Sequence, residues 1–132
     1  MSRENVEFLR AVYAEWGRGN FRAGVDRYDP EVVLIQGEGF PEAGTYDGLD
    51  GFADYMHTFL DAWERVTIEA EELVDAGDSV VAAVLQVGVG KGSGASTDFR
   101  YFQVWTFRDG KMIRLEVIRE RDAAFEAAAA ST

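Results

Sequence analysis

Three side chains of this 132-residue chain could transfer protons beside an apolar pocket: Tyr13, Glu38 and His57. His57 is the only histidine. Its spacing from Asp54 and Asp61 favours the solvated side of a helix over the edge of a pocket, where it would act as a general base. Tyr13 instead falls on the apolar face of a predicted helix, so it could approach a buried ligand.

Glu38 and a second carboxylate, Glu42, fall in a segment built on glycine and proline. Either could reach over a pocket mouth and serve as a displaced base. Carboxylates in loops are more often solvated, and that is the favoured interpretation for both.

Gln103 is the polar residue that points most directly to a pocket. It alternates with Tyr101 and Trp105 along a predicted strand, so all three share one face. Its amide could orient the carbonyl or hydroxyl group of a ligand, or it could be a buried amide satisfied by neighbouring backbone. Tyr46, at the entry to a helix, is a further pocket candidate. For Trp16 and Trp63, core packing is favoured, because aromatic residues at helical spacing usually pack the core.

The sequence predicts neither a metal site nor a cofactor. There are no cysteines, and one histidine is too few for an ordinary zinc site. Four aspartates, at positions 47, 50, 54 and 61, have the spacing of a helix cap and a solvated face rather than of a calcium loop. The glycine-rich segment at 88–94 lacks the phosphate-loop pattern and lies between two strands, so a flexible hairpin connection is favoured.

The formal net charge of -11 argues against nucleic acid and anionic membrane surfaces as partners. No apolar run approaches the roughly 20 residues needed to span a bilayer. The first residues, MSRENVEF, are polar and charged, unlike a secretory signal. These features predict a cytoplasmic protein formed of one domain over residues 1–132.

Amphipathic spacing predicts a helix over residues 2 to about 18, a short helix at 21–28, and a third from Asp47 to about Arg65. Asp47 is the expected N-cap of the third helix, with Asp50 in a capping-box position. The segment at 122–130 is alanine-rich and is predicted to be a frayed helix.

Five strands are predicted, at 31–36, 66–74, 79–89, 97–108 and 112–120, with a loop at 37–46. Asp109-Gly110 indicates a tight hairpin. This order predicts an α+β fold, a curved antiparallel sheet with helices packed on its concave face around a pocket. Ile113, Leu115 and Val117 should share one face of the last strand. The opposite face of the sheet also carries apolar residues, which predicts a homodimer through it.

Four segments together resemble the SnoaL-like family of the NTF2-like, or ketosteroid-isomerase-like, superfamily. They are YAEWGRGN at 13–20, YDPEV at 28–32, GTYDG at 44–48 and VWTFRDGKM at 104–112. The resemblance implies a cone-shaped fold over nearly the whole chain. It does not imply one activity, because one fold hosts several unrelated functions.

The resemblance also implies positions for acids and bases, and this chain departs from them. The general base of ketosteroid isomerases would fall at about Ile35, their helix-one tyrosine next to Tyr13 at Val12, and their second aspartate at Gln103. The histidine and aspartate of SnoaL-type cyclases would fall at Leu115 and Val117. Apolar side chains and a glutamine cannot perform acid–base work near neutral pH.

The leading hypothesis is therefore a pocket protein that binds a small apolar or amphipathic molecule, with no reaction specified. Its predicted lining is Ile35, Tyr46, Tyr55, Phe59, Phe99, Tyr101, Gln103, Trp105, Leu115 and Val117. One alternative is an isomerase, cyclase or dehydratase with relocated acid–base residues. Another is a protein-interaction module that uses the outer face of the sheet.

Overall fold

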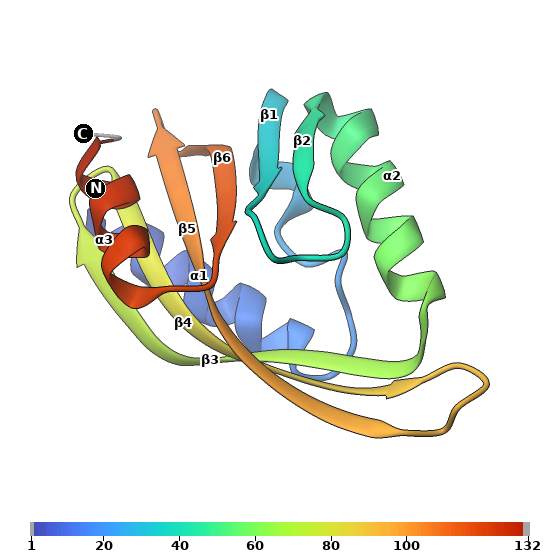
Figure 1. Ribbon diagram of the computed structural model, residues 1–132. Coiled ribbons are helices and arrows are strands. Elements are labelled where there is room, and N and C mark those ends of the chain that lie inside the picture. Colours follow the sequence, from blue (N-terminus) through green and yellow to red (C-terminus); the bar gives the residue numbers. More distant parts are fainter. Residues whose placement is uncertain (1, 131–132) are drawn as a thin grey trace.

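The computed structural model describes residues 2–130 and contains three α-helices, one short 3₁₀ helix and one sheet of six strands (Figure 1). In chain order the elements are α1 (Ser2–Trp16), η1 (Val25–Arg27), β1 (Tyr28–Gln36), β2 (Gly44–Asp47), α2 (Gly48–Asp61), β3 (Trp63–Ala76), β4 (Ser79–Gly90), β5 (Ser96–Arg108), β6 (Lys111–Ile118) and α3 (Arg121–Ala130). This is the predicted α+β class.

The sheet is mixed rather than wholly antiparallel. Its strand order is β2-β1-β6-β5-β4-β3, and β1 runs parallel to β6. Parallel neighbours need a long connection, which here comprises every element from β2 to β5. Strand β2 begins within the predicted loop at 37–46 and pairs antiparallel with the end of β1. Strand β1 begins at Tyr28, ahead of the predicted start, and its register against β6 is irregular around Pro30, which has no N–H to donate.

One predicted helix is not formed, and another ends earlier than predicted. In place of a helix at 21–28 there is only η1, because Gly24 adopts a left-handed conformation (φ 84°) and lies against Phe8 and Val12. Helix α2 ends at Asp61 instead of Arg65, and Trp63 already pairs with Gly90. Asp47 occupies the N-cap position but makes no capping hydrogen bond through its side chain.

The inner face of the sheet follows the predicted alternation along β5. Tyr101, Trp105 and Phe107 are buried in the main core, and Phe99 packs against that core. The hairpin between β5 and β6 turns at Asp109 and Gly110, which both have positive φ. The alternation fails at the start of β6, where a bulge opposite Thr106 and Phe107 puts Met112 in the core in place of Ile113.

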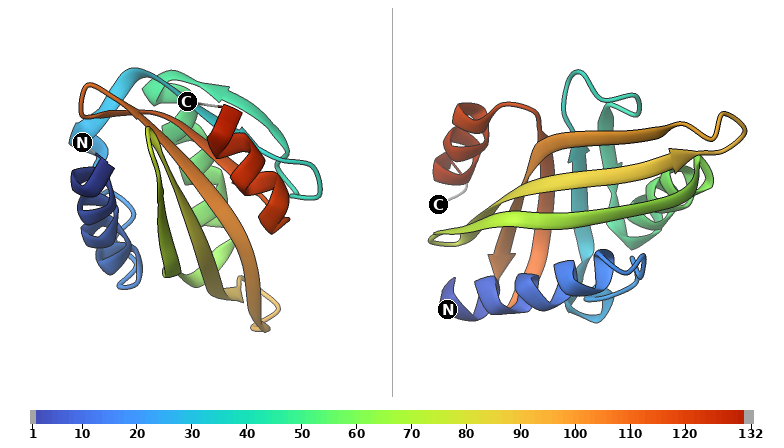
Figure 2. Two further views of the ribbon diagram at one scale, coloured as in Figure 1. Left: turned by 90° about the vertical axis from the view of Figure 1, so that its left-hand side faces the viewer. Right: turned by 90° about the horizontal axis from the view of Figure 1, so that it is seen from below.

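Helix α3 covers part of the outer face of the sheet, on the side opposite α1 (Figure 2). Its Ala124 and Ala128 are buried against Val81 of β4 and Val104 of β5 in a second, smaller core. The predicted C-terminal helix is therefore present, but it is docked on the outer face instead of frayed, in addition to the helices packed on the concave face. Small side chains let this helix approach the sheet closely, which local sequence alone does not reveal. No helix within residues 2–130 is long and apolar enough to cross a membrane.

Candidate functional site

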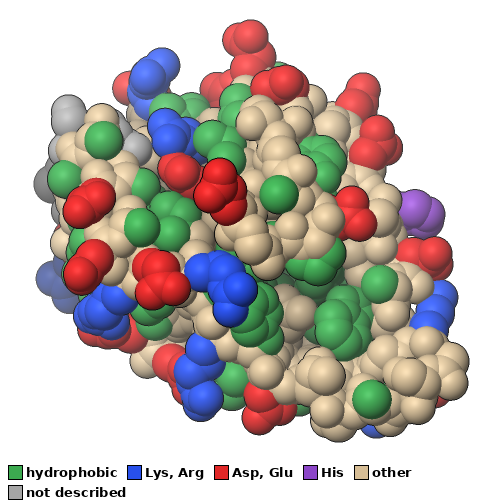
Figure 3. Space-filling model, in the orientation of Figure 1, with side chains coloured by type: hydrophobic (Ala, Val, Ile, Leu, Met, Phe, Trp, Pro, Cys, Tyr) green, Lys and Arg blue, Asp and Glu red, His purple; other side chains and the backbone are tan. Residues whose placement is uncertain are grey.

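A cavity of about 440 Å³ lies between α2 and the inner face of the sheet. Figure 3 shows hydrophobic side chains around a hollow on this face of the molecule. Strand β1, the loop after it, α2 and strands β3 to β6 all contribute to the walls. The lining consists of Trp16, Leu34, Gln36, Phe40, Pro41, Glu42, Phe52, Tyr55, Met56, Thr58, Phe59, Ala62, Trp63, Ile68, Gln86, Thr97, Asp98, Phe99, Tyr101, Gln103, Leu115 and Val117.

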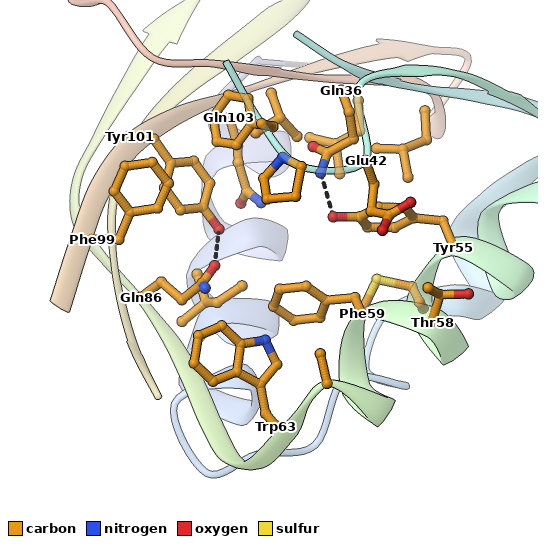
Figure 4. Close-up of a pocket in the computed structure, with 18 of the residues that line it drawn as sticks. Gln36, Glu42, Tyr55, Thr58, Phe59, Trp63, Gln86, Phe99, Tyr101 and Gln103 are labelled. Carbon is orange, nitrogen blue, oxygen red and sulfur yellow. Dashed lines mark hydrogen bonds between the residues drawn. The ribbon is translucent and has the colours of Figure 1, made fainter. Parts of the chain in front are cut away.

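Two groups of aromatic rings form facing walls (Figure 4). On α2, Tyr55 stacks on Phe59 with ring centroids 6.1 Å apart, and Phe59 lies 6.4 Å from the ring of Trp63. On the sheet side, Phe99 and Tyr101 are 5.1 Å apart. Phe40, from the loop after β1, packs on both of them at 5.8 and 5.4 Å.

A hydrogen-bond relay fixes the orientation of Gln103. The indole N–H of Trp105 donates to the Tyr13 hydroxyl at 2.7 Å. An indole nitrogen can only donate, so the Tyr13 oxygen is the acceptor there. The Tyr13 proton is then donated to Oε1 of Gln103. This leaves the Nε2 amide group of Gln103, a residue only 4% exposed, as a hydrogen-bond donor toward the cavity.

Two further glutamines line the cavity, each paired with a tyrosine (Figure 4). The Tyr101 hydroxyl donates to Oε1 of Gln86 at 2.8 Å. Gln36 donates through Nε2 to the Tyr55 hydroxyl, and its own Oε1 is buried with no hydrogen-bond partner among the described residues. Buried polar atoms are normally satisfied, so the unpaired carbonyl of Gln36 is an exception beside the cavity.

Burial raises the pKa of the Tyr13 hydroxyl well above its usual value of 10.0. Burial also raises the pKa of Tyr101 and of Tyr55, and for Tyr55 the nearby Tyr46 and Glu42 raise it further. These hydroxyls therefore stay protonated near neutral pH. They act as hydrogen-bonding groups and not as bases.

The cavity mouth carries the exposed residues of the lining, among them Glu42, Thr58, Thr97 and Asp98. No Lys, Arg or His belongs to the lining. Across residues 2–130, no three His, Cys, Asp or Glu side chains gather in a way that could hold a metal ion.

Seven of the ten residues predicted for the pocket line this cavity: Tyr55, Phe59, Phe99, Tyr101, Gln103, Leu115 and Val117. The other three do not belong to the lining. Ile35 points away from it, because Leu34 and Gln36 occupy the cavity side of β1. Trp105 is fully buried behind it, and Tyr46 packs on the ring of Tyr55 at 5.1 Å.

The three candidates for proton transfer do not meet at the cavity. Tyr13 is buried behind Gln103, and its hydroxyl is used in the relay. Glu38 is exposed and lies outside the lining. His57 is exposed on the surface of α2 (Figure 3), as its spacing from Asp54 and Asp61 indicates.

Sequence reasoning missed two of the three cavity amides. Gln86 lies opposite Phe99 in the β4–β5 register, and it alternates with the apolar residues Leu85 and Val87, so the alternation along the strand indicates its direction. Gln36 could have been found from the alternation of Val32 and Leu34 with it, since all three are buried. The error there was a shift of one residue, which exchanges the two faces of a strand.

Several solved structures have a fold similar to that of this chain. The chain is similar to TerC, crystallised with polyporic acid, at 23% identity, with a TM-score of 0.75 and coverage of 95% of this chain and 98% of TerC. It is also similar to an NTF2-like protein from Burkholderia thailandensis, at 24% identity, a TM-score of 0.76 and coverage of 96% and 95%.

A third similar structure is a hypothetical protein with a ketosteroid isomerase-like fold from Catenulispora acidiphila, in complex with trimethylamine. It is 15% identical, with a TM-score of 0.73 and coverage of 93% of this chain and 92% of that one. At these identities the likeness shows the fold alone. No curated protein matches the chain. The family model of the SnoaL-like domain matches residues 9–115, and the protein therefore belongs to the SnoaL-like domain family.

Proposed function

We propose that this protein binds a flat, mostly apolar small molecule with one or two polar groups. The observation that carries the proposal is the pair of aromatic walls that face each other across the cavity (Figure 4). Planar rings gain both buried area and favourable ring–ring geometry between such walls. A few placed polar groups in a mainly apolar cavity are typical of small-molecule sites.

Gln103 is the proposed anchor for the polar end of the ligand. Its Nε2 group is a donor, so it suits an accepting oxygen such as that of a ketone. Because the lining has no Lys, Arg or His, a negatively charged ligand would lose its hydration with no counter-charge. The proposed ligand is therefore uncharged or cationic. The small molecules bound by TerC and by the Catenulispora protein support occupation of this kind of fold by a ligand.

The test compares two probes of the same shape, 2-acetylnaphthalene and 2-isopropylnaphthalene, in titrations followed by tryptophan fluorescence. Wild-type protein should bind both and prefer the ketone by about tenfold, the ratio expected from one hydrogen bond to a buried donor. Gln103→Met should remove this preference, because the methionine has no donor.

Gln86→Met is the matched control. Gln86 also lines the cavity, but among the described residues no donor fixes the direction of its hydrogen bond with the Tyr101 hydroxyl, as Trp105 does for Tyr13 and Gln103. Gln86→Met should retain the preference for the ketone. If wild-type protein binds neither probe, the proposed function is wrong. Equal affinity of wild-type protein for the two probes would rule out the polar anchor.

A second candidate function, proton-transfer catalysis on such a ligand, is favoured by one observation. Glu42 lines the cavity next to Tyr55, close enough that its charge raises the pKa of that hydroxyl. Of the two loop carboxylates, Glu42 is therefore the better placed as a displaced base, ahead of Glu38. The reaction would be of the isomerase, cyclase or dehydratase type.

The homodimer remains a proposal, now on a smaller surface. Leu85, Val87 and Val89 lie half-buried on the outer face of β4, outside both core clusters and beyond the part that α3 covers. A second copy of the chain would bury this strip. The cytoplasmic location likewise remains a prediction from the sequence.

A further inference from the structure

Trp63 lies directly on Gly88 at the mouth of the cavity. A Cβ atom added to Gly88 would lie 2.5 and 2.6 Å from two carbons of the indole ring. Carbon atoms do not approach so closely, so a side chain at this position would displace either the ring or the strand. The indole thus fills the space that a side chain would take.

The backbone of Gly88 does not require glycine. It is not one of the glycines with positive φ, and it pairs regularly with both Val66 and Thr97. A glycine within a strand weakens the strand and often marks a close approach. Among the described residues, the close contact with Trp63 explains why residue 88 is a glycine.

A bulge in β3 brings Trp63 into this position. Trp63 pairs with Gly90, whereas Arg65 pairs with the adjacent Val89. The extra residue between them is a β-bulge that changes the direction of β3 at its start. The Trp63 ring is half-buried, packs on Phe59 and borders the cavity. In Figure 4 the indole lies beside Phe59 at the edge of the cavity.

We infer that Gly88 sets the width of ligand that the mouth admits, by letting Trp63 lie flat against β4. This inference rests on the proposed function. A methyl group at residue 88 would push the indole into the mouth, because β4 is held on both sides by strands β3 and β5. The mouth would then exclude broad ring systems and still admit narrow ones.

The contact between Trp63 and Gly88 is separate from the polar anchor, Gln103. Gln103 pairs with Ala82, and Gly88 is six residues further along β4, so the backbones of the two sites are well separated although the side chains of Gln103 and Trp63 border the same cavity. Trp63 therefore acts on the apolar end of the ligand, and a substitution at Gly88 should leave the contact with Gln103 unchanged.

The experiment measures the affinities of a narrow and a broad ketone, 2-acetylnaphthalene and 1-acetylpyrene. Gly88→Ala should keep the affinity for the narrow ketone within about twofold and lower that for the broad one by about tenfold or more, since only the broad one needs the full mouth. In a Trp63→Leu background, the same Gly88→Ala change should alter the two affinities equally or not at all, because a coupled pair loses its coupling when one member is removed.

Gly90→Ala is the matched control, because its added Cβ would meet only the flexible Ser93 hydroxyl, at 3.0 Å. It should leave both affinities unchanged. A second readout does not depend on ligand. Trp16 and Trp105 are 2% and 0% exposed, so quenching by acrylamide reports mainly on Trp63 and should increase in Gly88→Ala.

Equal losses for the two ketones in Gly88→Ala, or a selective loss that persists with Trp63→Leu, would overturn the inference and leave the proposed function intact. Failure of the wild-type protein to bind either ketone would refute the proposed function, and the inference would fail with it. Unchanged quenching in Gly88→Ala would also count against displacement of the indole.

Discussion

Tyr13 and Trp105 decide which group Gln103 presents to the cavity, although neither belongs to the lining. A free glutamine can offer either its carbonyl or its amide nitrogen. Here the chain of donors beginning at Trp105 directs the carbonyl of Gln103 away from the cavity. The chemistry that the pocket can recognise is therefore determined by residues behind its wall.

The carboxylate at the mouth allows the binding and catalytic proposals to be separated by one substitution. Glu42→Gln should leave the affinity for 2-acetylnaphthalene nearly unchanged, because Glu42 lies at the exposed rim and not at the anchor. If Glu42 is a base, wild-type protein will speed exchange of the methyl protons of this ketone for deuterium. The variant should then lose that acceleration by about 100-fold or more, the usual contribution of a general base.

Proton NMR in D₂O measures this exchange directly. Glu38→Gln is the control, since it removes an exposed carboxylate of the same loop that lies outside the lining. Exchange at the uncatalysed rate with wild-type protein, or equal exchange in both variants, would eliminate Glu42 as a base and leave binding as the function.

At the scale of elements, two ion pairs connect β3 to helix α3 and to strand β5. Glu72 pairs with Arg121 of α3 at 3.0 Å, and Glu71 pairs with Arg100 of β5 at 2.9 Å. The hydrogen bond and charge of Arg121 hold the pKa of Glu72 below its usual 4.5, and Arg100 does the same for Glu71. Because both pairs are exposed, each contributes little to stability by itself.

The Glu72–Arg121 pair predicts how α3 docking depends on pH. Since the pKa of Glu72 is lower in the folded protein, its stabilising effect is present above about pH 4.5 and is lost as the pH falls through the folded value. Arg121→Gln should therefore lower the melting temperature at pH 7, and the part of the loss due to the pair should disappear toward pH 3. Melting curves across this range measure it.

Arg108→Gln is the control, because it removes the same charge from a residue that forms no ion pair among residues 2–130. Arg121 also lies over the rings of Phe102 and Phe125, at 5.9 and 5.1 Å. A constant part of the loss in Arg121→Gln should thus remain at low pH. A difference from wild type that does not change with pH would show that the ion pair is not involved.

For the whole molecule, the uncovered strip on β4 predicts the oligomeric state. Leu85, Val87 and Val89 project from one face at alternate positions, next to the part of the sheet that α3 covers. We expect light scattering after gel filtration to give twice the chain mass of 14.7 kDa. Val87→Lys should give the mass of one chain, because a buried unpaired charge is costly at an interface.

Val25→Lys is the matched control, since Val25 is an apolar side chain that is 44% exposed and lies in η1, away from this strip. It should not change the mass. A single-chain mass for the wild-type protein would contradict the dimer and favour a surface free to bind a different protein.

The sequence alone determined features that depend on neighbours along the chain. Alternation along β5 placed Phe99, Tyr101 and Gln103 on one face, and Asp109-Gly110 located the hairpin. The amphipathic patterns of α1 and α2 gave the two long helices. These features follow from local periodicity and turn chemistry, which hold whatever the rest of the chain does.

Only the tertiary structure decided which distant residues meet. Gln103 is oriented by a residue 90 positions away, Gln36 and not Ile35 reaches the cavity, and α3 packs on the outer face. Strand pairing, bulges and helix docking set these contacts, and a shift of one residue in a strand reverses its two faces. The alternation thus indicated that a pocket exists, whereas long-range packing determined what that pocket presents to a ligand.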